Sequence, residues 1–326
     1  MKIVIDMMGS DAGSVVTVPA VRNFNKLHPD VKLYVVGKKE EIDSLSDIAT
    51  VIDARDVIQM EAGPMEFMRA KNASMHVAFD TYIKEQADAY ISAGSTGGVL
   101  SGATLKLKLI PGVERAAILS PFPTKIKGNY VVILDIGANI ENNPLQLSQF
   151  ALMGRLYAQN VYGKKDPKTY LLSNGTEPTK GSPLGKETHK LLVAQNFPNF
   201  KGNIEGKEVL SGEADVVVTD GYTGNVLLKS VEGTAKLMSS MLGDAFRKSA
   251  MTKIGYLFAK SGIKDLKERM DYKNTGGAML AGINGLVIKA HGSSDVKGFT
   301  SALEVAYKMA DKQVVALLRE GFKVNA

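Results

Sequence analysis

The chain has 326 residues, of which 44% are hydrophobic, and is therefore long enough to build a large α/β core as one domain or as two lobes. It contains no cysteine, which excludes disulfide bonds, thiolate metal sites and a cysteine nucleophile. The formal net charge of +6 at pH 7 suits an anionic ligand, an acidic protein partner or an anionic membrane surface, and nucleic acid is disfavoured because no binding motif or aromatic-rich basic stripe accompanies the charge.

Short apolar strand patterns alternate with helical patterns along the chain. This βαβα order predicts a mostly parallel sheet with right-handed crossovers. The first strand pattern begins at Lys2 rather than in a signal peptide, and no stretch of about 18 apolar residues could span a membrane, so we expect a cytoplasmic enzyme. The expected strands are Lys2–Asp6, Lys32–Val36, Thr50–Asp53, Ala89–Ser92, Ala116–Leu119, Val131–Asp135, Thr169–Leu172, Gly202–Ile204, Asp215–Thr219 and Val287–Lys289.

A glycine-rich turn follows the fourth expected strand. Gly94, Gly97 and Gly98 allow a tight turn with bare backbone N–H groups, and Ser95 and Thr96 add hydroxyl donors. A helix start with its positive dipole end comes next. These features predict an anion site with phosphate as the expected ligand, and the alternative is a plain tight turn that binds nothing.

Two further strand patterns end in the same kinds of residue, Asp, Gly and Asn. Because the carboxyl ends of parallel strands carry the ligands in open α/β sheets, these ends could converge with the glycine turn on one cleft. Asn225 and Lys229 are four positions apart and so share a helical face, although the lysine could simply be solvated. The aspartates could instead cap the helices that follow. The candidates at the strand ends are Asp6, Asp135, Asn139, Asp220, Asn225 and Lys229.

Residues 239–272 interrupt the strand–helix rhythm with a long helical pattern. Apolar positions cluster on one side of the helical wheel and basic residues surround them. We expect a protruding pair of helices that docks on an anionic membrane surface or an acidic partner, and the alternative is a dimer interface or a core-facing pair. The expected contact residues are Ile254, Leu257, Phe258 and Lys260.

The last expected strand ends in Lys289, and His291 lies between it and a Gly-Ser-Ser-Asp turn. A ligand-facing histidine would occupy such a place, and a structural histidine that bonds the turn is the alternative. No metal site is expected, because the sequence has no His-x-x-x-His, no clustered carboxylate loop and no cysteine. No cofactor is expected either.

Eight motifs in order along the whole chain resemble the bacterial phosphate acyltransferase family. Two positions depart from the family pattern: Ser10 replaces a glycine and Ser95 replaces an asparagine, and both keep hydrogen-bonding capacity. The motifs are Ile5-Asp6-Met7-Met8-Gly9-Ser10-Asp11, Ile91-Ser92-Ala93-Gly94-Ser95-Thr96-Gly97, Leu134-Asp135-Ile136-Gly137-Ala138-Asn139, Gln149-Phe150-Ala151-Leu152-Met153-Gly154, Asn174-Gly175-Thr176-Glu177-Pro178-Thr179-Lys180-Gly181, Asp220-Gly221-Tyr222-Thr223-Gly224-Asn225-Val226-Leu227-Leu228-Lys229, Gly276-Gly277-Ala278 and Ile288-Lys289-Ala290-His291-Gly292.

The resemblance implies transfer of a long-chain fatty acyl group from acyl carrier protein to inorganic phosphate, which gives acyl phosphate for phospholipid synthesis. It further implies a homodimer that associates peripherally with the inner face of the cell membrane and supplies a membrane acyl-phosphate:glycerol-3-phosphate acyltransferase. The implied fold is a three-layer α/β/α domain similar to isocitrate and isopropylmalate dehydrogenases, over residues 1–326, with residues 239–272 as a helical protrusion.

The residues themselves suit this chemistry. Phosphate is already an anionic oxygen nucleophile, so the protein must hold it and stabilise the tetrahedral oxyanion that forms. We expect catalytic roles for Lys229, Lys289 and His291. The expected phosphate- and substrate-binding residues are Asp6, Gly9, Ser10, Gly94, Ser95, Thr96, Gly97, Asp135, Asn139, Asp220 and Asn225.

Two other functions stay open from the sequence. One is a metal- and nicotinamide-dependent decarboxylating dehydrogenase of similar fold, for which neither the aspartate triad nor the arginine cluster is arranged in the sequence. The other is a scaffold for a membrane or a carrier protein, in which residues 239–272 supply the whole function.

Overall fold

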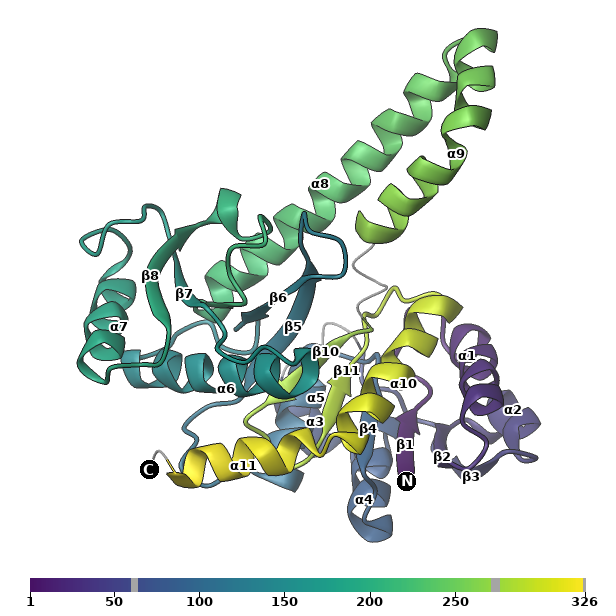
Figure 1. Cartoon of the computed structure of the whole chain (residues 1–326). Coiled ribbons are helices and arrows are strands. Elements are labelled where there is room, and N and C mark those ends of the chain that lie inside the picture. Colours follow the sequence, from purple (N-terminus) through teal and green to yellow (C-terminus); the bar gives the residue numbers. More distant parts are fainter. Residues whose placement is uncertain (60–63, 271–275, 325–326) are drawn as a thin grey trace.

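The computed structural model describes residues 1–59, 64–270 and 276–324. Within them, the strands form an 11-stranded sheet with the order β3-β2-β1-β4-β11-β10-β5-β6-β9-β7-β8 (Figure 1). The strands are β1 Lys2–Asp6, β2 Lys32–Gly37, β3 Ala49–Asp53, β4 Ala89–Ser92, β5 Ala117–Pro123, β6 Tyr130–Leu134, β7 Thr169–Ser173, β8 Phe200–Glu205, β9 Val216–Val218, β10 Ala278–Ala281 and β11 Val287–Lys289. The α-helices are α1 Ser14–Leu27, α2 Lys39–Ile42, α3 Pro64–Arg69, α4 Ser74–Glu85, α5 Thr96–Gly102, α6 Pro144–Tyr162, α7 Pro183–Ala194, α8 Gly221–Arg247, α9 Ala250–Met270, α10 Val296–Asp311 and α11 Val314–Val324.

The sheet consists of two parallel halves that run in opposite directions. Strands β3, β2, β1, β4 and β11 are parallel to one another, and so are β6, β9, β7 and β8. The antiparallel pairs β11–β10, β10–β5 and β5–β6 join the halves. The predicted mostly parallel α/β sheet is therefore confirmed, with a reversal of direction at its centre.

Helices cover both faces of the sheet, as the alternating side chains of the strands require. In β1, Ile3 and Ile5 pack in a core cluster with α1, α6 and α10, whereas Val4 packs on the opposite face with side chains of α3 and α4. A third cluster lies over the other half and includes Ile133 of β6 together with Leu228 of α8. The result is the expected three-layer α/β/α arrangement.

Strand β10 was missing from the expected strands. It is four residues long, has alanine at both ends and follows Gly276 and Gly277, so it lacks the β-branched residues that mark strands such as β1, β6 and β9. Its partners on both sides hold it: Met279 is in register with Ile288 of β11 and with Leu119 of β5. Tertiary pairing therefore makes this strand, not local propensity.

Helices α8 and α9 pack against each other and project away from the sheet (Figure 1). The predicted helical pair is confirmed, but α8 begins at Gly221, well before the expected start at residue 239, and Asp220 caps it. Positions 271 and 272 of the expected segment lie outside the described residues. The exposed fractions of Leu257 and Phe258, 68% and 86%, contradict a core-facing role for these two side chains. No helix in the described part of the chain is long and apolar enough to span a bilayer.

The loop after β1 lies directly against the turn after β4. The Cα of Gly9 faces the Cα of Gly94 so closely that a Cβ on Gly9 would overlap the backbone of Gly94. Between the two strands, the buried carboxylate of Asp6 accepts hydrogen bonds from the hydroxyls of Ser74 and Ser92, each at 2.7 Å. The glycines thus permit a close approach of two backbones that the Asp6 carboxylate holds together.

Replacement of Gly9 tests this contact. Gly9→Ala should lower the free energy of unfolding by about 1–3 kcal/mol, because the added methyl group must displace backbone rather than a flexible side chain. Gly233→Ala is the control, since a Cβ at this exposed position of α8 meets nothing within 4 Å and should be neutral or slightly stabilising. Chemical denaturation measures both variants, and equal stability of the two would contradict the close contact.

Candidate active site

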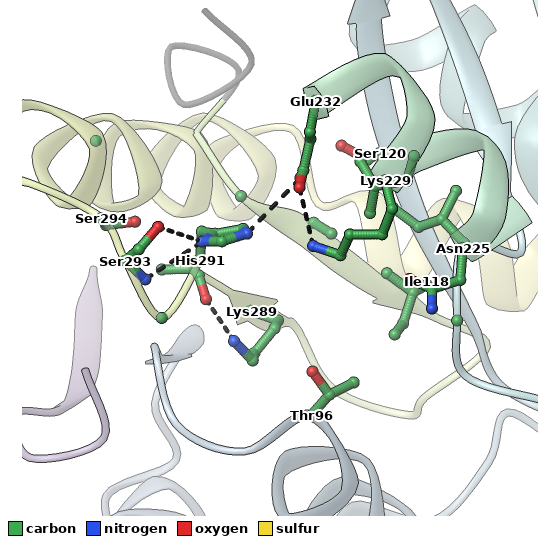
Figure 2. A pocket seen from close by; sticks show the side chains of 18 of the residues that line it. Thr96, Ile118, Ser120, Asn225, Lys229, Glu232, Lys289, His291, Ser293 and Ser294 are labelled. Carbon is green, nitrogen blue, oxygen red and sulfur yellow. Dashed lines mark hydrogen bonds and ion pairs between the residues drawn. The ribbon is translucent and has the colours of Figure 1, made fainter. Parts of the chain in front are cut away.

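A pocket of about 420 Å³ lies over the central strands, between the two halves of the sheet. Ile118 and Ser120 of β5 form part of its wall. Segments from both halves surround them: the turn after β4, the end of β11, the loop after β6 and the first turns of α8, which follows β9. Strand ends that are far apart in the sequence therefore meet around one cavity, as the sequence analysis anticipated. Figure 2 shows the side chains that line it.

The three residues expected to be catalytic, Lys229, Lys289 and His291, all line this pocket. Lys229 comes from α8 in one half of the sheet, and Lys289 and His291 come from the end of β11 in the other half. Thr96 and Asn225 also line the pocket. The fold thus brings two lysines and one histidine to a common cavity, where together they can attract an anion.

Lys289 is buried, and its ammonium is held by backbone carbonyls. Its Nζ lies 2.6 Å from the carbonyl oxygen of Ala290 and 3.3 Å from that of Ala93. The pKa of Lys289 is lowered to about 8, chiefly by burial and also by the charge of Lys229, whereas the charges of Asp11 and Asp6 oppose the change. A lysine with this pKa is mostly charged at neutral pH yet can lose a proton at little cost.

The orientation of His291 is set by the turn that follows it. The backbone N–H of Ser293 donates to Nδ1 at 3.2 Å, and the Ser293 hydroxyl lies 2.9 Å from the same atom. Because a backbone N–H can only donate, Nδ1 is an acceptor and the proton of the neutral ring resides on Nε2. The turn-bonding alternative is therefore present in the structure, and it leaves Nε2 directed into the pocket (Figure 2).

The sequence analysis missed Glu232, which lies between Lys229 and His291 (Figure 2). Its Oε2 accepts a hydrogen bond from Lys229 Nζ at 2.9 Å, and its Oε1 lies 3.7 Å from His291 Nε2. The signal that could have found it is spacing, because Glu232 follows Lys229 by three positions and Asn225 by seven on one helical face. Asp11 lines the pocket as well and was likewise not among the candidates.

The glycine turn contributes less to the pocket than expected. Of the candidates Gly94, Ser95, Thr96 and Gly97, Thr96 is the one that lines this pocket. The N–H of Gly94 donates to Ser92 Oγ at 3.0 Å, and the N–H of Gly98 donates to the side chain of Ser95, the N-cap of α5. The expectation that the N–H groups of these two glycines are bare is therefore wrong, because neighbouring serines use them.

Four of the other candidates support the backbone rather than line the pocket. Ser10 Oγ donates to the carbonyl of Gly13 at 3.2 Å, whereas Gly9 packs on the glycine turn and Asp6 joins the two strands. Burial raises the pKa of Asp6, opposed by its hydrogen bonds from Ser74 and Ser92. Asp220 caps α8 by accepting from the N–H of Thr223 at 2.8 Å, as its capping alternative predicted.

Asp135 organises the loop after β6 without capping a helix. Its buried carboxylate accepts from the backbone N–H groups of Ile118, Gly137, Ala138 and Asn139, at 2.8 to 3.0 Å. The capping alternative is wrong for Asp135, because the next helix, α6, begins later and has its own cap. Burial raises the pKa of Asp135, and the hydrogen bonds oppose this.

The Asn139 side chain is turned toward the protein and away from a ligand role. It donates to the carbonyl of Ala116 at 2.7 Å and to Asp135 Oδ2 at 2.9 Å. Gly137 of the same loop lines the pocket instead.

Part of the pocket lining is apolar, and this part is called the apolar floor. Ile118, Ile136, Leu228 and Ala278 supply it, so an anionic group and an apolar chain could lie side by side in one cavity. Among the described residues, no group of three or more His, Asp or Glu side chains is arranged to hold a metal ion. The arrangement can bind an anion beside an uncharged, partly apolar reactant and can stabilise negative charge that develops between them.

Comparison with known proteins gives two kinds of match. The model of a family described as "Fatty acid synthesis protein" matches residues 1–317. A protein named phosphate acyltransferase from Streptococcus pyogenes serotype M5 is 40% identical over 326 residues, which cover 98% of this chain and 97% of the relative.

Solved structures resemble the fold at lower identity. A phosphotransacetylase from Streptococcus pyogenes has a TM-score of 0.62 at 17% identity, with 97% of this chain and 94% of that chain covered. A 4-hydroxythreonine-4-phosphate dehydrogenase from Klebsiella pneumoniae has a TM-score of 0.55 at 11% identity, with 95% of this chain and 99% of that chain covered. These two likenesses establish the fold and nothing beyond it.

Lys289→Met tests the cost of burying the ammonium. In the folded protein the pKa of about 8 lies below the ordinary value of 10.5, so the penalty is complete below about pH 8 and fades as the pH rises toward the ordinary value. The difference between the two pKa values corresponds to a free-energy penalty of at most about 3 kcal/mol for the charged form in the folded protein. We therefore expect the variant to be more stable by about 1–3 kcal/mol near pH 7, with the gain reduced near pH 10.

Chemical denaturation at the two pH values measures this difference. A variant that is less stable than the wild type near pH 7, or a gain that does not change with pH, would contradict the assignment of the penalty to Lys289.

Proposed function

The chain belongs to the phosphate acyltransferase family of fatty acid synthesis proteins, and on this premise we propose that it transfers a long-chain fatty acyl group from acyl carrier protein to inorganic phosphate, forming acyl phosphate for phospholipid synthesis. The observation that carries the proposal is the meeting of Lys229 and Lys289 across one pocket, beside an apolar floor. Phosphate requires the cations, and the acyl chain requires the floor.

Phosphate attacks the thioester carbonyl directly. It is an anionic oxygen nucleophile at neutral pH, so no side chain has to carry the acyl group, and the chain has no cysteine that could. Lys229 and Lys289 hold the phosphate from opposite sides of the pocket. Thr96 and Asn225, which line the same pocket, offer a hydroxyl and an amide as further donors.

Collapse of the tetrahedral intermediate releases the thiolate of the carrier. A thiol with a pKa of about 8.5 leaves with little acid assistance, so the demanding step is stabilisation of the oxyanion. Lys289 is the strongest candidate for this role, because its ammonium is buried and already fixed by two carbonyls. His291 Nε2 is the second candidate donor.

The partners follow from the same chemistry. An acidic carrier protein suits a chain of net charge +6, and acyl phosphate suits consumption by a membrane acyl-phosphate:glycerol-3-phosphate acyltransferase. We propose that the protein is a homodimer, works in the cytoplasm and meets the inner face of the cell membrane through α8 and α9. Ile254, Leu257 and Phe258 on α9 are each more than half exposed, which supports a docking role for this helix.

The dehydrogenase alternative has little support. The likeness to a dehydrogenase is a likeness of fold at 11% identity, whereas the relative at 40% identity is a phosphate acyltransferase. The scaffold alternative does not explain why Lys229 and Lys289 line one central pocket, because a scaffold needs no anion site there.

A direct assay tests the reaction. Purified protein without added metal should release carrier thiol from palmitoyl acyl carrier protein only when inorganic phosphate is present, and hydroxylamine should trap the acyl phosphate. Lys229→Met should lower kcat/KM for phosphate about 10²-fold, because a charged donor at the anion is lost. Its control is Lys186→Met on the exposed side of α7, which should change nothing.

Palmitoyl coenzyme A in place of the carrier substrate identifies the preferred donor. Release of thiol without phosphate, or no release from either donor by folded protein, would contradict the proposed reaction.

The docking role of α9 is tested separately with anionic phospholipid vesicles. The double variant Leu257→Gln, Phe258→Gln should lose at least tenfold in vesicle binding by sedimentation, because burial of each side chain contributes about 1.5–3 kcal/mol. Val193→Gln on α7, where the valine is 55% exposed, is the matched control and should bind as the wild type does. Unchanged vesicle binding together with a changed oligomeric state would assign these residues to a dimer interface instead.

A further inference from the structure

Glu232 places a carboxylate beside the two lysines of the pocket, which Asp11 also lines. Its side chain is 13% exposed and points between Lys229 and His291 (Figure 2). A carboxylate at this place repels an anionic ligand, so its presence beside two lysines calls for a chemical reason. The ion pair with Lys229, at 2.9 Å, accounts for one carboxylate oxygen only.

The second carboxylate oxygen, Oε1, lacks a hydrogen-bond donor within the described part of the chain. It is buried and has no hydrogen-bond partner among the described residues, since His291 Nε2 at 3.7 Å is beyond hydrogen-bond distance. An ionised carboxylate can only accept hydrogen bonds, and a buried acceptor without a donor is unfavourable. A ligand that brings a hydrogen-bond donor, and with it a proton, into the pocket would complete Glu232.

Inorganic phosphate carries such a proton and sulfate does not. Near neutral pH phosphate keeps at least one P–OH group, whereas sulfate is fully deprotonated although its size and shape are similar. The ammonium groups of Lys229 and Lys289 serve the deprotonated oxygens of either anion equally. The carboxylate oxygen of Glu232 can accept a hydrogen bond from the protonated oxygen of phosphate. A sulfate oxygen in the same place has no proton, so its lone pairs would face those of the carboxylate and repel them.

We propose that Glu232 Oε1 accepts a hydrogen bond from the protonated oxygen of phosphate and thereby makes the pocket select phosphate over sulfate. This inference rests on the proposed function, because it assigns the pocket to phosphate. Glu232 is then a specificity residue: it orients the bound phosphate, with the P–OH toward Glu232 Oε1 and the deprotonated oxygens toward the two lysine ammonium groups. Phosphate bound in this way keeps deprotonated oxygens, one of which is the nucleophile.

Calorimetric binding of inorganic phosphate and of sulfate near neutral pH tests the proposal without any turnover. The wild type should bind phosphate at least tenfold more tightly than sulfate. In Glu232→Gln the amide can donate to sulfate, so this preference should fall at least tenfold, with sulfate affinity rising. Glu232→Asp keeps the acceptor and should keep the preference at lower affinity.

The matched control is Glu187→Gln, which makes the same change of charge at an exposed position of α7 and should leave the preference unchanged. Arsenate, which also keeps a proton near neutral pH, should bind the wild type as phosphate does. A wild type that binds sulfate as tightly as phosphate, or a Glu232→Gln variant that keeps the full preference, overturns the role of Glu232.

The acyl phosphate assay separates this inference from the proposed function. Wild-type protein that forms acyl phosphate while Glu232→Gln keeps the preference for phosphate retains the function and rejects the inference. Wild-type protein that binds neither anion and forms no acyl phosphate rejects both.

Discussion

The constraint on which the site depends is the repulsion between two lysines that approach one pocket from opposite halves of the sheet. The pKa of Lys289 is lowered there, because its ammonium is buried and lies near the charge of Lys229. Carbonyl groups hold the ammonium of Lys289, and Glu232 holds that of Lys229. Like charges at one pocket repel each other, and an anion bound between the two ammonium groups would offset that repulsion.

Two buried aspartates prepare the backbone around this pocket in similar ways. Asp6 ends β1 and Asp135 follows β6, and each collects several hydrogen-bond donors around one carboxylate. Asp6 ties the glycine turn after β4 to the first strand, whereas Asp135 shapes the loop that places Gly137 at the pocket. Polar side chains at strand ends thus divide into those that shape the surrounding backbone and those that line the pocket.

The sequence was sufficient for the strands and for the convergence of their ends, because long apolar runs and glycine turns are local signals. It was insufficient for β10, which forms because its residues pair with β11 on one side and with β5 on the other. The sequence also could not predict that the N–H of Gly94 donates to Ser92 Oγ, because this hydrogen bond depends on the rotamer of Ser92. Nor could spacing separate Asn139, bonded to Asp135, from Asn225, which lines the pocket. The roles expected for the site residues stay predictions.

Helix α8 is one unbroken element of 27 residues that is anchored at its start and projects away from the sheet at its far end (Figure 1). Gly221 and Gly224 seat its first turn against the loop of Asp135. At about 1.5 Å per residue, Lys229 lies about 12 Å along the axis from Gly221 and Arg247 about 39 Å. If α8 tilts as a rigid rod about its anchored end, a movement of its tip by about 5 Å moves Lys229 by only about 1.5 Å. Displacements of the point where α8 meets α9 therefore reach Lys229 reduced about threefold, so the geometry of the pocket changes little when the tip moves.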